Sequence, residues 1–163
     1  MTSLDDFVSD SPRCAVGHIP DSSFDELVLY GTVLPWTNAW HGIPGANGQA
    51  FEAALSVQRN DWQRLQQRFP DATLIVAGDF NQDLARWHYY GSKRKRSLLQ
   101  TALIQSNLIA LTAGDNDPIG RDSPPRACID HICISSDMEL KVGGSQRWPN
   151  TPAPWRRSRT TLE

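Results

Sequence analysis

Two short apolar segments, separated by a long amphipathic one, constrain the fold of this chain most strongly. Residues 27–36 (LVLYGTVLPW) form a near-continuous apolar run, and residues 74–78 (LIVAG) form a second. The first run is rich in β-branched and aromatic residues, which predicts a strand buried on both faces that stops at Pro35. In residues 49–69 the apolar side chains recur at spacings of three, four and seven, which predicts a helix; they are Phe51, Leu55, Trp62, Leu65 and Phe69. This order favours a strand–helix–strand crossover, although a sandwich with outer helices gives the same pattern.

The second half of the chain contains another helix and another clear strand. Residues 93–107 lack Pro and Gly, and a helix there brings four apolar side chains onto one face: Leu98, Leu99, Ala102 and Leu103. Residues 127–135 (ACIDHICIS) are rich in β-branched side chains and predict a strand. Shorter strands are expected at residues 14–17 and 108–111. We therefore expect a polar start with partial first strands over residues 1–26, one α/β core over 27–142, and an irregular Pro- and Arg-rich tail over 143–163.

Charge and cysteine content limit the classes of function. A length of 163 residues fits one domain, and a net charge of −2 provides no global basic field, so any contact with nucleic acid has to be local. The three cysteines are too few and too irregularly spaced for a disulfide framework, which indicates buried thiols in a reducing compartment. The acidic start (MTSLDDFVSD) is unlike a secretory signal, and no apolar run is long enough to span a bilayer. We expect a cytoplasmic protein, and its oligomeric state is left open.

Asp79 and Asn81 directly follow the second apolar segment. Side chains on either side of Phe80 point the same way in extended structure, so a carboxylate and an amide converge on one spot. Such a pair binds a hard cation or positions a water for attack. The alternative is an Asx turn that only ends the strand.

Asp130 is an acidic residue within the apolar strand 127–135. If it is buried, its charge requires a histidine, arginine or backbone amide as partner; the alternative is that the strand leaves it exposed. His131 points to the opposite face and cannot pair with it.

A basic run stands close to these residues. Lys93 and Arg94 open the run KRKR, just after Trp87, Tyr89 and Tyr90. The run is a candidate phosphate-binding patch or, alternatively, a solvated helix face. In the loop after the first apolar segment, Asn38 is a further candidate for substrate binding.

Three segments, in order, resemble motifs of the endonuclease/exonuclease/phosphatase superfamily, whose members are metal-dependent phosphoesterases. Residues 76–83 (VAGDFNQD) are similar to its central GDFN motif, residues 128–135 (CIDHICIS) to its later Asp-(Tyr/His) strand, and residues 30–36 (YGTVLPW) to its middle strand. The resemblance implies an incomplete four-layer α/β/β/α sandwich of the DNase I type, with mixed sheets and outer helices.

The resemblance also implies roles for individual residues. Asp79 would orient or deprotonate the attacking water, and Asn81 would hold a phosphate oxygen or the metal, expected to be Mg²⁺ or Mn²⁺. Asp130 would hydrogen-bond a catalytic histidine, while His131 is interpreted as structural. The partner implied is a phosphoester, with nucleic acid among the options.

Several family features are absent from the sequence. The upstream metal-binding glutamate has no counterpart other than Glu26, Val33 stands where many members have a middle-strand histidine, and no Ser-Asp-His motif occurs. We expect a chain shortened at both ends, with a frameshift as one hypothesis for its Pro- and Arg-rich end. The alternative function is therefore a catalytically inactive remnant or binding module of the same fold.

Overall fold

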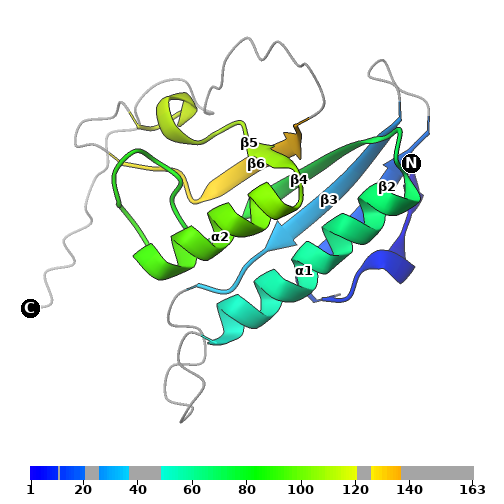
Figure 1. The fold of residues 1–163 in the computed structure, drawn as a ribbon, viewed down its shortest axis with the longest axis horizontal. Helices are drawn as coiled ribbons and strands as arrows, with labels where there is room; N and C mark the ends of the chain where they lie inside the picture. The colour runs from blue at the N-terminus through cyan, green and yellow to red at the C-terminus, as the bar shows by residue number, and fades with distance from the viewer. Residues whose placement is uncertain (11, 21–25, 37–48, 121–125, 137–163) are drawn as a thin grey trace, which may run out of the picture.

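The computed structural model describes residues 1–10, 12–20, 26–36, 49–120 and 126–136. Within these residues a six-stranded sheet runs in the order β1-β2-β3-β4-β6-β5, with helices packed against it (Figure 1). The strands are β1 (Thr2–Ser3), β2 (Cys14–Ile19), β3 (Leu27–Val33), β4 (Thr73–Asp79), β5 (Leu108–Ala110) and β6 (Asp130–Ser135). The helices are α1 (Gln49–Arg68) and α2 (Lys93–Gln105), with short 3-10 turns η1 (Asp5–Phe7) and η2 (Gly114–Asn116). The predicted fold class, α/β with a mixed sheet and outer helices, is confirmed.

Strands β3 and β4 are parallel neighbours at the centre of the sheet. They pair from Leu27 opposite Thr73 to Val33 opposite Asp79, whereas the other pairs of strands are antiparallel. Parallel neighbours need a long crossover connection, and α1 lies within it, as the apolar spacing predicts. The carboxyl ends of β3 and β4 consequently meet at one end of the sheet.

Both helices cover the same face of the sheet (Figure 1). Alternate residues of β3 and β4, such as Val28, Tyr30 and Val76, are buried beneath them. On the opposite face Val33 is 49% exposed and Ile132 is 47% exposed. The prediction that the first apolar run is buried on both faces is therefore wrong, because the described residues place a helix layer on only one face. Of the four predicted layers, the described residues form two.

Helix α1 supplies the largest part of the core, and it also carries a buried charge. Trp62 packs edge-on against Tyr30, with ring centroids 6.2 Å apart. Asp61 is fully buried, although the helical pattern assigns it to the polar side. The hydroxyl of Tyr30 and the backbone N–H of Ser9 donate hydrogen bonds to its carboxylate at 3.1 and 2.9 Å, which satisfies the buried charge and ties the first segment to α1. In the described part of the chain, neither helix is long and apolar enough to cross a membrane.

The three cysteines are unpaired, and their burial differs. Cys133 is buried, whereas Cys14 and Cys128 are half-buried. Burial raises the pKa of the Cys133 thiol to about 12, so this side chain stays protonated and packs as a small apolar group. The prediction of buried thiols is thus confirmed in full for Cys133 alone.

Gly78 allows β4 to lie against β3 just before the chain leaves the sheet. Its φ of +146° is one that side-chain-bearing residues rarely adopt, and an added Cβ atom would lie 2.0 Å from the carbonyl oxygen of Thr32. Gly114 also has a positive φ, of +59°, but open space surrounds the position of its Cβ. An alanine at Gly114 would therefore introduce backbone strain alone, whereas an alanine at Gly78 would introduce both backbone strain and a steric collision.

Gly78→Ala is expected to lower the free energy of unfolding by about 3 kcal/mol or more, because the strain of the positive φ adds to the collision with Thr32. Gly114→Ala is the matched control and should lose about 1 kcal/mol through its φ alone. Urea unfolding followed by circular dichroism measures both values. Equal losses in the two variants would show that β4 does not approach β3 as described.

Candidate active site

The candidate site lies where β3 and β4 end together. The backbone N–H of Leu34 donates to the carbonyl of Asp79 at 2.8 Å, which continues the strand pairing by one step. The side-chain amide of Asn81 donates to the carbonyl of Leu34 at 2.8 Å. These two bonds fix the segment after β4 against the segment after β3.

Asp79 and Asn81 form a compact turn. The backbone N–H of Asn81 donates to Oδ1 of Asp79 at 2.8 Å, and its side-chain Nδ2 donates to Oδ2 at 3.0 Å. Asn81 adopts a φ of 50°, in the left-handed region that asparagine tolerates better than most residues. The first of these bonds is an Asx turn, so the two sequence interpretations are compatible: the residues converge, and they also end the strand.

The contacts of Asn81 determine which side-chain atom remains available. Nδ2 donates to two acceptors, the Leu34 carbonyl and the Asp79 carboxylate. A flipped amide would place Oδ1 against both, which fixes the orientation. Oδ1 receives no hydrogen bond from any residue that the structure describes. Asn81 therefore offers an oxygen acceptor, and its donors are already used.

Asp130 faces Asp79 across the β4–β6 pair, in direct register. Opposite residues of an antiparallel pair place their side chains on the same face, and here it is the face that no described helix covers. Asp130 is exposed, so the alternative of an exposed carboxylate is correct and burial does not force it to have a partner. No hydrogen bond or ion pair of its side chain is found within the described residues.

The surroundings of Asp79 shift the pKa of its carboxyl group. Burial raises the pKa of Asp79 above its ordinary value, and the nearby charge of Asp130 raises it further. The hydrogen bonds from Asn81 act in the opposite direction, because they stabilise the ionised form. The net direction is upward, which makes Asp79 a stronger base than an ordinary aspartate.

His131 lies on the other face of β6, as the alternation of a strand predicts. It is buried, with Nε2 donating to the carbonyl of Gln82 at 3.0 Å and Nδ1 accepting from the hydroxyl of Thr112 at 3.1 Å. Burial lowers its pKa, which favours the neutral ring. Its contacts join β6 to the segment that follows Asn81 and to the segment after β5.

Among the described residues, Lys93 and Arg94 make no hydrogen bond or ion pair with Asp79, Asn81 or Asp130. Lys93 and Arg94 are exposed at the start of α2, and Arg94 forms an ion pair with Glu52 of α1 at 2.8 Å. Asn38 lies outside the described residues. Glu26 adjoins the opposite end of β3, where it bonds His18 at 2.6 Å, so it cannot replace the upstream glutamate of the family.

Sequence reasoning assigned no role to Asp83, the last residue of VAGDFNQD. It is fully buried and pairs with Arg96 of α2 at 3.0 Å. A carboxylate immediately before the apolar pair Leu84 and Ala85 was the signal available in the sequence.

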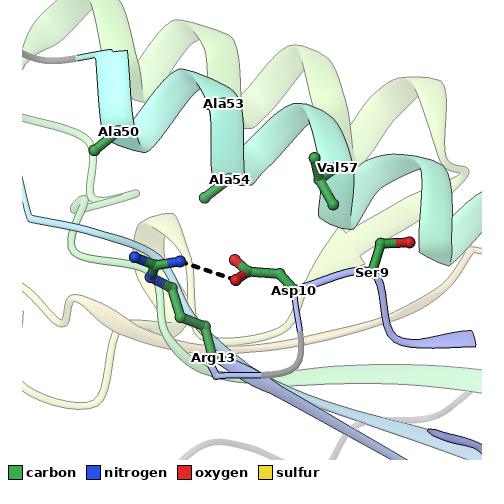
Figure 2. A pocket seen from close by; sticks show the side chains of 7 residues that line it. All are labelled: Ser9, Asp10, Arg13, Ala50, Ala53, Ala54 and Val57. Atoms are coloured by element: carbon green, nitrogen blue, oxygen red, sulfur yellow. Dashed lines mark hydrogen bonds and ion pairs between the residues drawn. The ribbon is translucent and has the colours of Figure 1, made fainter. Parts of the chain in front are cut away.

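A separate hollow of about 190 Å³ lies between α1 and the segment before β2 (Figure 2). Most of the side chains that line it are small. The exceptions are Asp10 and Arg13, which form an ion pair at 2.8 Å. The lining residues are Ser9, Asp10, Arg13, Ala50, Ala53, Ala54 and Val57. None of them belongs to the Asp79 group, and their paired charges offer no free acid or base.

Asp130→Asn is expected to lower the pKa of Asp79, because it removes the neighbouring negative charge that opposes ionisation. A carbon-13 NMR titration of the Asp79 carboxyl measures this shift without any substrate or metal. Asp115→Asn, at an exposed aspartate that pairs with Arg86, is the control and should leave the pKa unchanged. An unaltered or higher pKa in Asp130→Asn would contradict the described pairing.

Comparisons with solved structures find proteins of similar fold. The chain resembles the endonuclease domain of TRAS1, a telomere-specific non-LTR retrotransposon, with a TM-score of 0.54 and 16% identity over 84% of this chain and 54% of that one. A 3'-5' exonuclease (NExo) from Neisseria meningitidis matches with a TM-score of 0.49 and 16% identity over 76% of this chain and 52% of that one. The chain thus spans about half the length of these solved proteins. At this identity the first likeness establishes the fold alone.

Sequence comparison identifies the family. No curated protein matches the chain. A model of the Endonuclease/Exonuclease/phosphatase family, however, matches residues 3–155. This range includes all three segments on which the resemblance rests. The chain therefore belongs to the Endonuclease/Exonuclease/phosphatase family.

Proposed function

We propose that this chain is a metal-dependent phosphoesterase domain that hydrolyses a phosphodiester or phosphomonoester through attack of an activated water. The observation that carries the proposal is the Asp79–Asn81 turn beside Asp130, on the face of the sheet that no described helix covers. Family members are generally nucleases or phosphoesterases.

The donor set fits a hard divalent cation. Members of the family generally depend on such a metal. Among the described residues, no group of three or more His, Cys, Asp or Glu side chains is arranged to hold a metal ion by itself. Mg²⁺, however, often uses one or two carboxylates and completes its shell with waters and phosphate oxygens. Asp79, Asp130 and Oδ1 of Asn81 provide oxygen ligands of this kind, and a cation there would relieve the repulsion that raises the pKa of Asp79. We propose that these residues hold Mg²⁺ or Mn²⁺.

Each residue has a distinct role in the proposed reaction. Asp79 accepts the proton of the attacking water, for which its carboxylate at the end of β4 is the proposed acceptor. Because its Nδ2 donates elsewhere, Asn81 acts through Oδ1, as a ligand or as the acceptor that orients the water, and not as a donor to a phosphate oxygen. When bound, the cation polarises the phosphoryl oxygen and neutralises charge that develops in the transition state.

A nucleic acid is the substrate class that we favour. The solved domain with a TM-score of 0.54 is an endonuclease. The candidates for binding the phosphate backbone remain Lys93, Arg94 and Asn38. Lys93 is exposed. The cytoplasmic location also stays a prediction.

The second candidate is a binding module without catalysis. It is favoured by Val33, which lies beside Asp79 in the β3–β4 register and offers no polar group there. It is favoured also by Asp130, for which no described histidine is a partner.

Hydrolysis of bis(p-nitrophenyl) phosphate with Mg²⁺ decides between the two candidates. Asp79→Asn should reduce the rate by about 100-fold or more, because it removes the proposed base and one charge of the cation site. Asp115→Asn makes the same change of charge at an exposed aspartate that pairs with Arg86 and should retain the wild-type rate. Thermal unfolding verifies that each variant is folded.

Binding of the metal can be measured without turnover. Electron paramagnetic resonance of Mn²⁺ should show a bound ion in the wild type and in Asp115→Asn, and much weaker binding in Asp79→Asn. Equal hydrolysis by the wild type and Asp79→Asn would overturn the enzymatic proposal and favour the binding module.

A further inference from the structure

The segment that joins β4 to α2 is a closed loop. At its base, the backbone N–H of Ser92 donates to the side-chain oxygen of Gln82 at 3.0 Å. One residue further in, the backbone N–H groups of Tyr89 and Tyr90 donate to Oδ2 of Asp83 at 3.0 and 2.8 Å. Residues 82–92 thus return to their starting point, which is the geometry of an Ω-loop.

Arg96 fixes the interior of this loop. Its guanidinium donates to Oδ1 of Asp83 and to the carbonyl of Trp87, both at 3.0 Å, and also to the carbonyl of Ala85. Every acceptor lies within the loop. A buried ion pair adds little net stability, so the consequence of these bonds is a single, defined course of the backbone.

The loop presents its aromatic side chains to solvent. Trp87 is 41% exposed and Tyr89 is 47% exposed. Their backbone atoms are held by Arg96 and Asp83, respectively, while the rings are not buried in the core. A rigid backbone with exposed rings loses little conformational entropy when a ligand stacks on it.

The loop adjoins the candidate active site. It begins at Gln82, directly after Asn81. The bond from His131 to the carbonyl of Gln82 attaches the start of the loop to the helix-covered face of β6, opposite to the face that carries Asp130. Figure 1 shows the connection leaving the end of β4 and running into α2. Lys93, at the start of α2, is exposed and makes no ion pair within the described residues.

We propose that Trp87 and Tyr89 form a stacking platform for unpaired bases and make the site selective for single-stranded nucleic acid. Every base presents a π-face to such rings, whereas paired bases within a duplex are already stacked on each other. The ammonium group of Lys93 supplies a local positive charge for the phosphate backbone, which the net charge of −2 does not provide. This inference rests on the proposed function, and it specifies the class of substrate.

Fluorescence anisotropy of a dye-labelled oligothymidylate tests the platform. The buffer contains EDTA, so binding is measured without hydrolysis. Trp87→Ala and Tyr89→Ala should each weaken binding about tenfold, whereas Trp87→Phe should retain most of it because the aromatic face remains. Ile104→Ala removes an apolar side chain that is 76% exposed on α2, and this control should bind like the wild type. A duplex of the same length should bind more weakly than the single strand.

The results separate this inference from the proposed function. Wild-type affinity in both alanine variants, or equal affinity for duplex and single strand, would overturn the platform, even if bis(p-nitrophenyl) phosphate is hydrolysed. Binding that depends on Trp87 and Tyr89 supports the platform, even if no hydrolysis occurs.

Discussion

The parallel pairing of β3 with β4 is the constraint on which the rest of the structure depends. Parallel neighbours require a long crossover, which makes α1 necessary and places it on one face of the sheet. The same pairing brings the carboxyl ends of both strands together, so the chain after β4 can bond to the chain after β3. Gly78 permits the close approach, because any side chain there would meet the carbonyl of Thr32.

The two faces of the sheet differ in the side chains that they carry. Beneath the helices lie apolar side chains and polar groups that are satisfied internally, such as His131 and Thr112. The opposite face carries Asp79 and Asp130, and it is here that the pKa of Asp79 is raised. The exposed Asp130 carboxylate needs no partner, whereas the buried Asp83 carboxylate is bound by Arg96 and two backbone N–H groups.

Much of the fold could be predicted from local pattern. The helix predicted over residues 49–69 is found as Gln49–Arg68, and the one predicted over 93–107 is found as Lys93–Gln105. The strand over 127–135 is shorter, Asp130–Ser135, and the first apolar run is exposed on one face. The predicted burial of both faces was wrong because apolar composition shows only that a strand can be buried. Whether it is buried depends on which other elements pack against each face of the sheet.

By itself, the sequence determined the family, the order of the elements and the convergence of Asp79 with Asn81, since these depend on residue type and spacing over short distances. Only the tertiary structure decided that Asp130 stands opposite Asp79, that the donors of Asn81 are already used, and that Asp83 and Arg96 hold the loop of Trp87 and Tyr89. Strand register and contacts between distant segments decide these features, and no local pattern encodes them.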